Sequence, residues 1–200
     1  AMNYVKSTNL WLTRRGFLGG AAGLSFAVSF GAGGLSLIPA AEAKGKGLNI
    51  GAWVRIAPDN SIIIITPAAE MGQGSMTGVP TALAEELDAD WSRVTLEMAP
   101  ADPSTYGYAS WGGRKSMGIY GSFAMRRYYT LVRMAGAQVR RVLLVNVAQK
   151  WDIDFRELKT QPSIVVHPPS GREMSYGEVA AFARVPTEMP AIAKSDLKKK

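Results

Sequence analysis

The chain has 200 residues, of which 47% are apolar and 20% are charged, a composition typical of a globular protein and not of a disordered one. Lysine and arginine outnumber aspartate and glutamate by 23 to 16, so the net charge of +7 suits an anionic ligand without indicating nucleic acid. Cysteine is absent and His167 is the one histidine. Disulfides, thiolate zinc sites, cysteine-bound iron–sulfur clusters and two-histidine metal sites are therefore excluded for this chain.

The first 43 residues have the order of segments expected of an export signal. Arg14 and Arg15 precede an uncharged run over residues 19–40, and Ala41–Ala43 supplies a small-x-small cleavage pattern. The arginine pair followed by apolar residues resembles a twin-arginine signal, which predicts export to the periplasm. The run is also long enough to cross a bilayer, so a membrane anchor is the alternative. We therefore place residues 1–43 outside the predicted domain.

A β-hairpin is predicted over residues 52–66. Trp53–Ile56 is one strand candidate, Pro58–Asn60 supplies the turn, and Ser61–Thr66 contains four consecutive isoleucines. Because that run is apolar at successive positions, we expect the second strand to be buried on both faces.

A helix, a strand and a long loop follow the hairpin. Apolar residues spaced by four predict a helix over residues 77–87, and residues 94–98 form a short strand candidate. Residues 102–120 are rich in glycine, serine, proline and aromatic residues, which predicts a loop.

The last predicted elements include the longest helix of the chain, over residues 122–150. Its buried stripe steps by four and three residues and consists of Tyr128, Val132, Ala135, Val139 and Val142. A strand over residues 163–167 and a short helix over 176–183, capped by Ser175, come next. The order of elements predicts a mixed α/β domain over residues 44–186, followed by a basic tail, 187–200, that adds nothing to a core.

The first candidate binding loop is Glu70–Gly74, between the isoleucine strand and the next helix. Gly72 and Gly74 permit positive φ and a close approach of the backbone to a ligand, and the helix start presents free N–H groups. The amide of Gln73 both donates and accepts hydrogen bonds. These features predict a cradle for a phosphate or another oxygen-rich group. The alternative is a tight strand-to-helix turn that requires glycine only for steric reasons and binds no ligand.

The second candidate binding loop is Trp111–Gly118, which leads into the long helix and carries the cations Arg114 and Lys115. Between Asp102 and Asp152 the chain contains no acidic residue but eight basic ones, namely Arg114, Lys115, Arg126, Arg127, Arg133, Arg140, Arg141 and Lys150. Such a bias suits an anion or an acidic partner. The alternative is a solvated basic surface.

Two segments carry a resemblance to a known family. They are PAAEMGQGSMTGVPTALAEELDADWSRVTLEMAPADP and WGGRKSMGIYGSFAMRRYYTLVRMAGAQVRRVL. Over residues 49–186 the chain resembles the molybdenum hydroxylases related to xanthine dehydrogenase and aldehyde oxidase. The greatest likeness is to the N-terminal part of molybdopterin-binding beta subunits of the isoquinoline 1-oxidoreductase type.

The resemblance implies that the chain is the N-terminal portion of a molybdopterin-binding domain. It assigns cofactor contacts to two groups of residues, which are Met71, Gly72, Gln73 and Gly74 in the first loop and Gly113, Arg114, Lys115, Ser116, Met117 and Gly118 in the second. Residues 118–120 look like an insertion relative to the family. The family's catalytic glutamate belongs to a later region, so we assign no catalytic residue and no metal ligand here, and we expect Glu85 and Glu86 to face solvent.

The resemblance also implies an activity and partners. Family enzymes hydroxylate a carbon beside nitrogen in an N-heteroaromatic ring, or an aldehyde carbon, with water as the oxygen source. The cofactor would be molybdopterin, in its dinucleotide form. Electrons would leave through iron–sulfur clusters on a small partner subunit, because this chain has no cysteine, and further large-subunit domains would complete the site. The alternative is an exported module without catalysis that binds cofactor or a partner chain. We interpret His167 as a surface residue.

Overall fold

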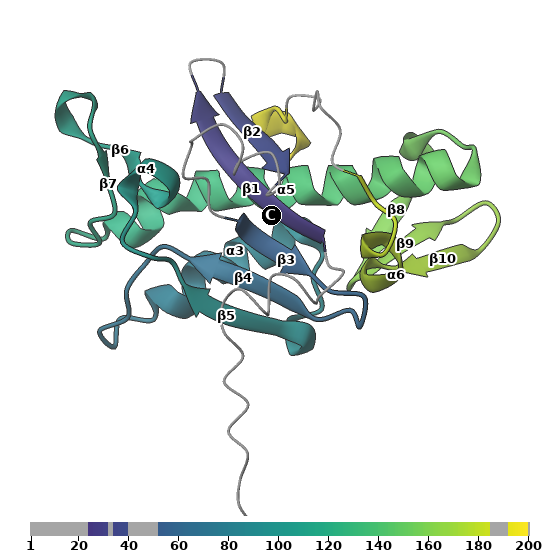
Figure 1. The fold of residues 1–200 in the computed structure, drawn as a ribbon, viewed down its shortest axis with the longest axis horizontal. Helices are drawn as coiled ribbons and strands as arrows, with labels where there is room; N and C mark the ends of the chain where they lie inside the picture. Colours follow the sequence, from purple (N-terminus) through teal and green to yellow (C-terminus); the bar gives the residue numbers. More distant parts are fainter. Residues whose placement is uncertain (1–23, 32–33, 40–51, 185–191, 200) are drawn as a thin grey trace, which may run out of the picture.

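The computed structural model describes residues 24–31, 34–39, 52–184 and 192–199. Its centre is a five-stranded sheet with the order β2-β1-β3-β4-β5, and two helices pack on one face of it (Figure 1). The strands are β1 (Leu24–Gly31), β2 (Gly34–Pro39), β3 (Ala52–Ile56), β4 (Ile62–Thr66) and β5 (Val94–Met98), and the helices are α3 (Ser75–Leu87) and α5 (Phe123–Trp151). The mixed α/β class predicted from the sequence is confirmed.

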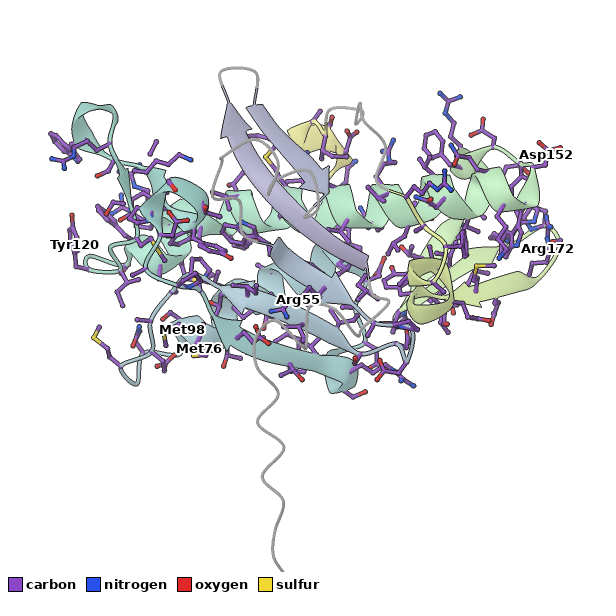
Figure 2. All side chains as sticks on the ribbon, viewed as in Figure 1. Arg55, Met76, Met98, Tyr120, Asp152 and Arg172 are labelled. Atoms are coloured by element: carbon purple, nitrogen blue, oxygen red, sulfur yellow. The ribbon has the colours of Figure 1, made fainter. Side chains whose placement is uncertain are left out.

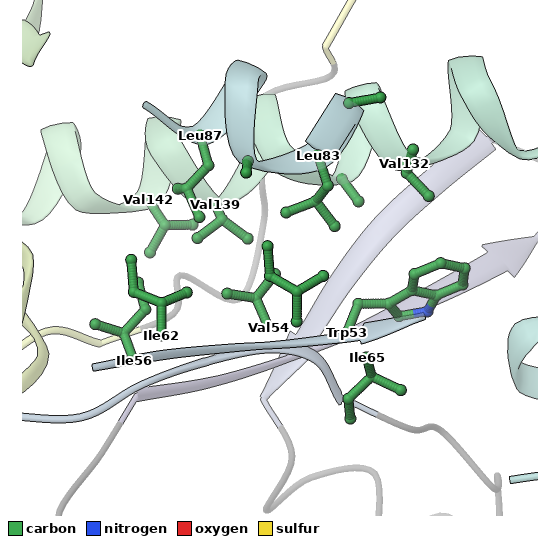
Figure 3. Close-up of a cluster of buried hydrophobic side chains, with 14 of the residues drawn as sticks. Trp53, Val54, Ile56, Ile62, Ile65, Leu83, Leu87, Val132, Val139 and Val142 are labelled. Atoms are coloured by element: carbon green, nitrogen blue, oxygen red, sulfur yellow. The ribbon is translucent and has the colours of Figure 1, made fainter. Parts of the chain in front are cut away.

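The core lies between the sheet and the two helices. Figure 3 shows strand side chains such as Val54 and Ile62 facing Leu83 and Leu87 of α3 and Val139 of α5. All five predicted stripe residues of α5 are buried, because a period of 3.6 residues keeps them on the side facing the sheet.

The predicted hairpin of β3 and β4 is confirmed, with Val54 opposite Ile64. Three of the four isoleucines are buried, but Ile63 is only half-buried, so the expected burial on both faces is wrong at that position. Ile63 lies opposite Arg55, whose side chain forms an ion pair with Glu97 of β5. The sheet therefore carries charged groups on the face where Ile63 lies.

Strands β4 and β5 are parallel, and α3 is the crossover between them. Parallel neighbours need such a connection, since a tight turn joins only antiparallel strands. Helix α3 also packs closely on α5 at Gly136, where a Cβ atom would lie 2.4 Å from the carbonyl oxygen of Leu83. This contact fixes the spacing of the two helices.

Strands β1 and β2 lie within the segment that the sequence analysis placed outside the domain. β1 pairs antiparallel with both β2 and β3. Residues 24–31 and 34–39 of the uncharged run thus extend the sheet of the full chain, a pairing that the sequence analysis did not expect. The role of this run as an export signal is a separate prediction, because the start of the chain and Ala41–Ala43 lie outside the described residues.

The predicted loop of residues 102–120 contains short elements. These are α4 (Pro103–Tyr106), β6 (Tyr108–Ala109), the 3-10 turn η2 (Trp111–Gly113) and β7 (Lys115–Ser116). Strands β6 and β7 pair as a small hairpin beside the N-terminal end of α5 (Figure 1).

A three-stranded sheet covers the other end of α5. It consists of β8 (Lys159–Gln161), β9 (Ile164–His167) and β10 (Arg172–Ser175), of which the sequence predicted only β9. Ser175 caps α6 (Tyr176–Ala180) through a reciprocal pair of contacts with Glu178, as the predicted cap requires. None of the helices in the described ranges has the length and hydropathy that a bilayer crossing requires.

The C-terminal segment packs against the domain, contrary to the prediction of a tail without a core role. Ile192 is buried, and Lys198 forms an ion pair with Asp88. Its backbone N–H donates to Glu86 Oε2 at 3.1 Å, and its carbonyl accepts from Arg133 at 2.7 Å. Lys198 thus joins the C-terminal segment to the acidic groups at the end of α3.

Candidate functional site

The first loop is organised by the carboxylate of Glu70. One of its oxygens accepts from the N–H groups of Gly72 at 2.7 Å and Gly74 at 2.9 Å, and the other accepts from Met76 at 3.0 Å. These bonds, led by the one from Gly74, lower the pKa of Glu70 from its usual value. The carboxylate thus satisfies donors at the start of α3, a position that favours negative charge.

Gln73, which is exposed, also holds the first loop in shape. Its Oε1 accepts from the N–H of Met71 at 2.6 Å, while its Nε2 donates to the carbonyl of Ala69 at 2.8 Å and to Ser75 Oγ at 2.6 Å. Both amide protons are therefore used within the loop. The contact of this amide with a cofactor stays a prediction, and in the structure the amide braces the loop.

The glycines of the first loop face open space. Gly72 and Gly74 have φ values of +94° and +77°, and a Cβ atom built on either meets nothing within 4 Å. Only glycine adopts these values without strain. A ligand can therefore approach the loop backbone closely. The N–H groups that an anionic ligand would bind there already donate to the Glu70 carboxylate.

The second loop is the turn of the β6–β7 hairpin. Gly112 and Gly113 have φ values of +69° and +74°, again with open space at the Cβ position. Arg114 is exposed, and Lys115 Nζ donates to the carbonyl of Ser104 at 2.6 Å. Two cations thus lie beside a glycine backbone that a ligand can approach.

The last part of the second loop is held in place by hydrogen bonds. Ser116 Oγ accepts from the N–H of Gly118 at 3.1 Å, and the carbonyl of Gly118 accepts from the hydroxyl of Tyr108 at 2.7 Å. Met117 is half-buried against the core. Only the first part of the loop is therefore open to solvent, while Ser116–Gly118 is held by the domain.

An aromatic cluster lies beneath the second loop. The ring of Tyr108 packs edge-on to Tyr128 at 5.2 Å and to Phe123 at 6.0 Å, and Arg127 lies over both Tyr108 and Phe123. The ring of Tyr106 packs on Trp53 beside this cluster. Burial raises the pKa of the Tyr106 hydroxyl to about 12. This packing gives the hairpin a rigid base.

The two loops lie at the same end of the molecule. Gly78 near the start of α3 faces Met125 near the start of α5, whereas Glu86 near the end of α3 pairs with Arg133 further along α5. The helices therefore run in the same direction and begin at one end, which Figure 2 shows with Met76 and Tyr120. We call this the loop end of the domain.

Large apolar side chains are exposed at the loop end. The exposed fractions are 77% for Met71, 86% for Trp111 and 70% for Tyr120. Each of these side chains offers apolar surface to a ligand or another protein that binds at this end. The loop end thus combines apolar groups, cations and open glycine backbone, a set suited to an extended anionic ligand with a ring system.

Sequence reasoning missed a buried ionic cluster at the seam of α3 and α5. Glu86 was expected to face solvent but is fully buried, and it accepts from Arg133 Nε at 2.7 Å and lies 3.8 Å from Arg140. Asp88 lies 3.6 Å from the same Arg140. The sequence carried only a partial signal, a helix with only basic charges after a helix that ends in acidic ones, and nothing in it placed the two helices side by side.

His167 was interpreted as a surface residue and is buried. Its Nδ1 lies 2.6 Å from Ser170 Oγ, and its Nε2 lies 3.3 Å from Glu157 Oε2. The ring therefore secures the turn after β9. Across the described ranges, no three His, Cys, Asp or Glu side chains are grouped so that they could hold a metal ion.

Comparisons with known proteins agree with the resemblance drawn from the two loops. Residues 19–198 match the family model of the molybdopterin cofactor-binding domain. The chain is 37% identical over 182 residues to isoquinoline 1-oxidoreductase subunit beta of Brevundimonas diminuta, an alignment that covers 90% of this chain and 23% of that protein. It is 30% identical over 129 residues to a membrane-bound aldehyde dehydrogenase (pyrroloquinoline-quinone) of Gluconacetobacter polyoxogenes, covering 64% and 15% respectively.

The fold also matches a solved structure. Reconstituted CO dehydrogenase from Oligotropha carboxidovorans superposes with a TM-score of 0.50 and 16% identity, over 82% of this chain and 20% of that chain. The chain thus spans less than a quarter of the length of these relatives. Since the family model covers most of the chain, this protein belongs to the molybdopterin cofactor-binding domain family.

Proposed function

We propose that the chain is the cofactor-binding part of a molybdenum hydroxylase large subunit. Its substrate would be an N-heteroaromatic compound or an aldehyde. A hydroxyl group from water would replace the hydrogen on the oxidised carbon, and the substrate and the water together would release two electrons and two protons. The names of the two relatives above support these substrate classes. Remaining large-subunit domains and a small iron–sulfur subunit would complete the enzyme, since this chain has no cysteine to hold a cluster.

The observation that carries the proposal is the pair of glycine loops at the loop end of a domain of this family. Both loops offer backbone that a ligand can approach closely, and the second adds Arg114 and Lys115. This donor set fits an anionic, oxygen-rich group such as molybdopterin. Two cations also favour the dinucleotide form, which carries an additional phosphate. When bound, the cofactor supplies the redox centre that accepts the two electrons.

The chain's own residues would bind and orient that group. Arg114 would contact its phosphate, the backbone of Gly72 and Gly113 would line it, and Gln73 would keep the first loop in shape. Glu70 already holds two N–H groups of the first loop and one at the start of α3, so the phosphate would lie at the second loop. Binding and positioning are the roles left to this chain, because no catalytic group is assigned to it.

Arg114→Gln tests the proposal in the assembled complex. Loss of a charged hydrogen bond of about 1.5–3 kcal/mol predicts at least a tenfold lower cofactor affinity, read as molybdenum content after dilution. Arg93→Gln is the control, since Arg93 pairs with Asp90 on the other side of the fold. Full molybdenum retention in Arg114→Gln would contradict the role of the second loop.

We also propose export by the twin-arginine route to the periplasm, with retention at the membrane as the alternative. The support is the Arg14–Arg15 pair ahead of the uncharged run. Replacing both arginines by lysine should leave the protein in the cytoplasm, and unchanged export would contradict this route. N-terminal sequencing tests cleavage before Lys44, which would remove β1 and β2 together with the signal.

A further inference from the structure

A cavity of about 340 Å³ lies between α5, β8 and the C-terminal segment. Its apolar lining comes from Leu144, Leu158 and Ile192, and its polar lining includes Arg141, Lys159 and Thr160. Sites for small molecules have volumes of roughly 300–1,000 Å³ and combine an apolar lining with a few polar groups. The cavity therefore has the size and composition of a small ligand site.

This cavity is separate from the loop end. Arg140, Arg141 and Leu144 lie 17 to 21 residues beyond Phe123, where α5 begins. At a rise of 1.5 Å per residue this is about 25–32 Å along the helix. A ligand here would not touch either glycine loop, so the inference does not depend on the proposed function.

Two cations at the cavity lie outside ion-pair distance of the carboxylates in the described part of the chain. Arg140 is matched by Glu86 and Asp88, whereas Arg141 and Lys159 form no ion pair within the described residues. Arg141 lies over the ring of Phe155, 4.8 Å from its centroid, which holds the guanidinium in place. The polar side of the cavity is therefore suited to an anionic group.

The C-terminal wall of the cavity is anchored. Ile192 is buried in it, and the backbone of Lys198 is held from both sides by Glu86 and Arg133. Asp196, which also borders the cavity, accepts from the N–H of Ala193 at 2.9 Å. One oxygen of the Asp196 carboxylate is thus hydrogen-bonded to the backbone of its own segment.

We propose that this cavity binds a small amphipathic anion. The acidic group, a carboxylate or a phosphate, lies between Arg141 and Lys159, and the apolar body packs on Leu144, Leu158 and Ile192. Thr160 offers a hydroxyl at the same rim, although it already contacts Asp88.

Titration of the full 200-residue chain with benzoate and with phenyl phosphate tests the proposal, with binding followed by calorimetry. Saturable binding of either probe supports it and identifies the acidic group. Benzyl alcohol and inorganic phosphate, which lack the charge and the apolar body respectively, should bind at least tenfold more weakly. No saturable binding of either probe, or equal binding of inorganic phosphate, would overturn the proposal.

Variants locate the binding. Arg141→Gln and Lys159→Gln should each weaken the better probe about tenfold, which corresponds to 1.4 kcal/mol. Arg126→Gln, at an exposed position 15 residues before Arg141 on α5, should leave its affinity unchanged. Thermal melting of each variant verifies folding, and Lys159 serves as the second test because its side chain is exposed. Unchanged affinity in both cavity variants would place the anion elsewhere and refute the site.

Discussion

Glu70 is the residue that shapes the first loop, through three hydrogen bonds from backbone N–H groups to its carboxylate. A sequence pattern identifies a glycine loop, but it does not say which side chain folds back onto the backbone. The same holds for Gln73, whose exposed amide donates to Ala69 and Ser75 beside it. The sequence analysis expected a ligand to bind the backbone N–H groups and the Gln73 amide. In the structure Glu70 accepts from those N–H groups, and the Gln73 amide donates to its own loop.

The lowered pKa of Glu70 predicts a pH-dependent contribution to stability. In the unfolded chain the carboxyl titrates near its usual 4.5, and in the folded chain it titrates lower. The contribution is therefore present above about pH 4.5 and is lost as the pH falls through the folded pKa. Melting curves of the wild type and Glu70→Gln should differ near neutral pH and converge in acid. A constant difference at all pH values would contradict this role.

Tyr108 and Tyr128 form a matched pair for testing the base of the second loop. The Tyr108 hydroxyl donates to Gly118, whereas the Tyr128 hydroxyl is buried with no hydrogen-bond partner in the described part of the chain. Tyr108→Phe should cost about 0.5–1.5 kcal/mol and speed amide exchange over residues 112–118. Tyr128→Phe should be neutral or stabilising. Equal effects of the two variants would show that Tyr108 does not position the loop.

Among the elements, those with a strong repeating pattern were predictable. The stripe of α5 and the isoleucine strand β4 appear in the structure within a few residues of their predicted bounds. Strands β8 and β10 were missed because Lys159–Gln161 and Arg172–Ser175 are polar, and they exist by pairing with β9. Their structure comes from neighbours, which a local pattern does not record.

The seam of α3 and α5 depends on one small residue. A side chain at Gly136 would meet the carbonyl of Leu83 at 2.4 Å, whereas one at Gly78 would meet only the sulfur of Met125 at 3.6 Å. Gly136→Ala should therefore destabilise the fold by about 1–3 kcal/mol. Gly78→Ala should be neutral or stabilising by up to about 1 kcal/mol, because alanine favours a helix. Chemical denaturation measures both, and a tolerated Gly136→Ala would contradict the close approach.

The burial of Glu86 follows from the same seam. Its position on α3 gives no local sign of burial, since a glutamate ten residues into a helix is ordinarily solvated. The close approach at Gly136 brings Arg133 and Arg140 to it, and Lys198 completes the cluster. Contacts among residues so far apart in sequence could not be predicted from spacing alone.

The loop end of the domain is an exposed surface that carries several apolar and cationic side chains. Met71, Trp111 and Tyr120 are among its exposed apolar side chains, and Arg114 adds charge. The chain spans 23% of the relative to which it is 37% identical. Such a surface is expected to be covered by cofactor and further domains in the assembled enzyme.

Molybdenum content tests the central claim most directly. On the proposed function the isolated chain should retain little molybdenum, because the remaining large-subunit domains would supply the rest of the cofactor site. Co-expressed and co-purified with a chain carrying the remaining large-subunit domains and the iron–sulfur subunit, it should yield about one molybdenum per complex, measured by elemental analysis against protein concentration. Stoichiometric molybdenum on the isolated chain, or a stable complex without molybdenum, would contradict the account.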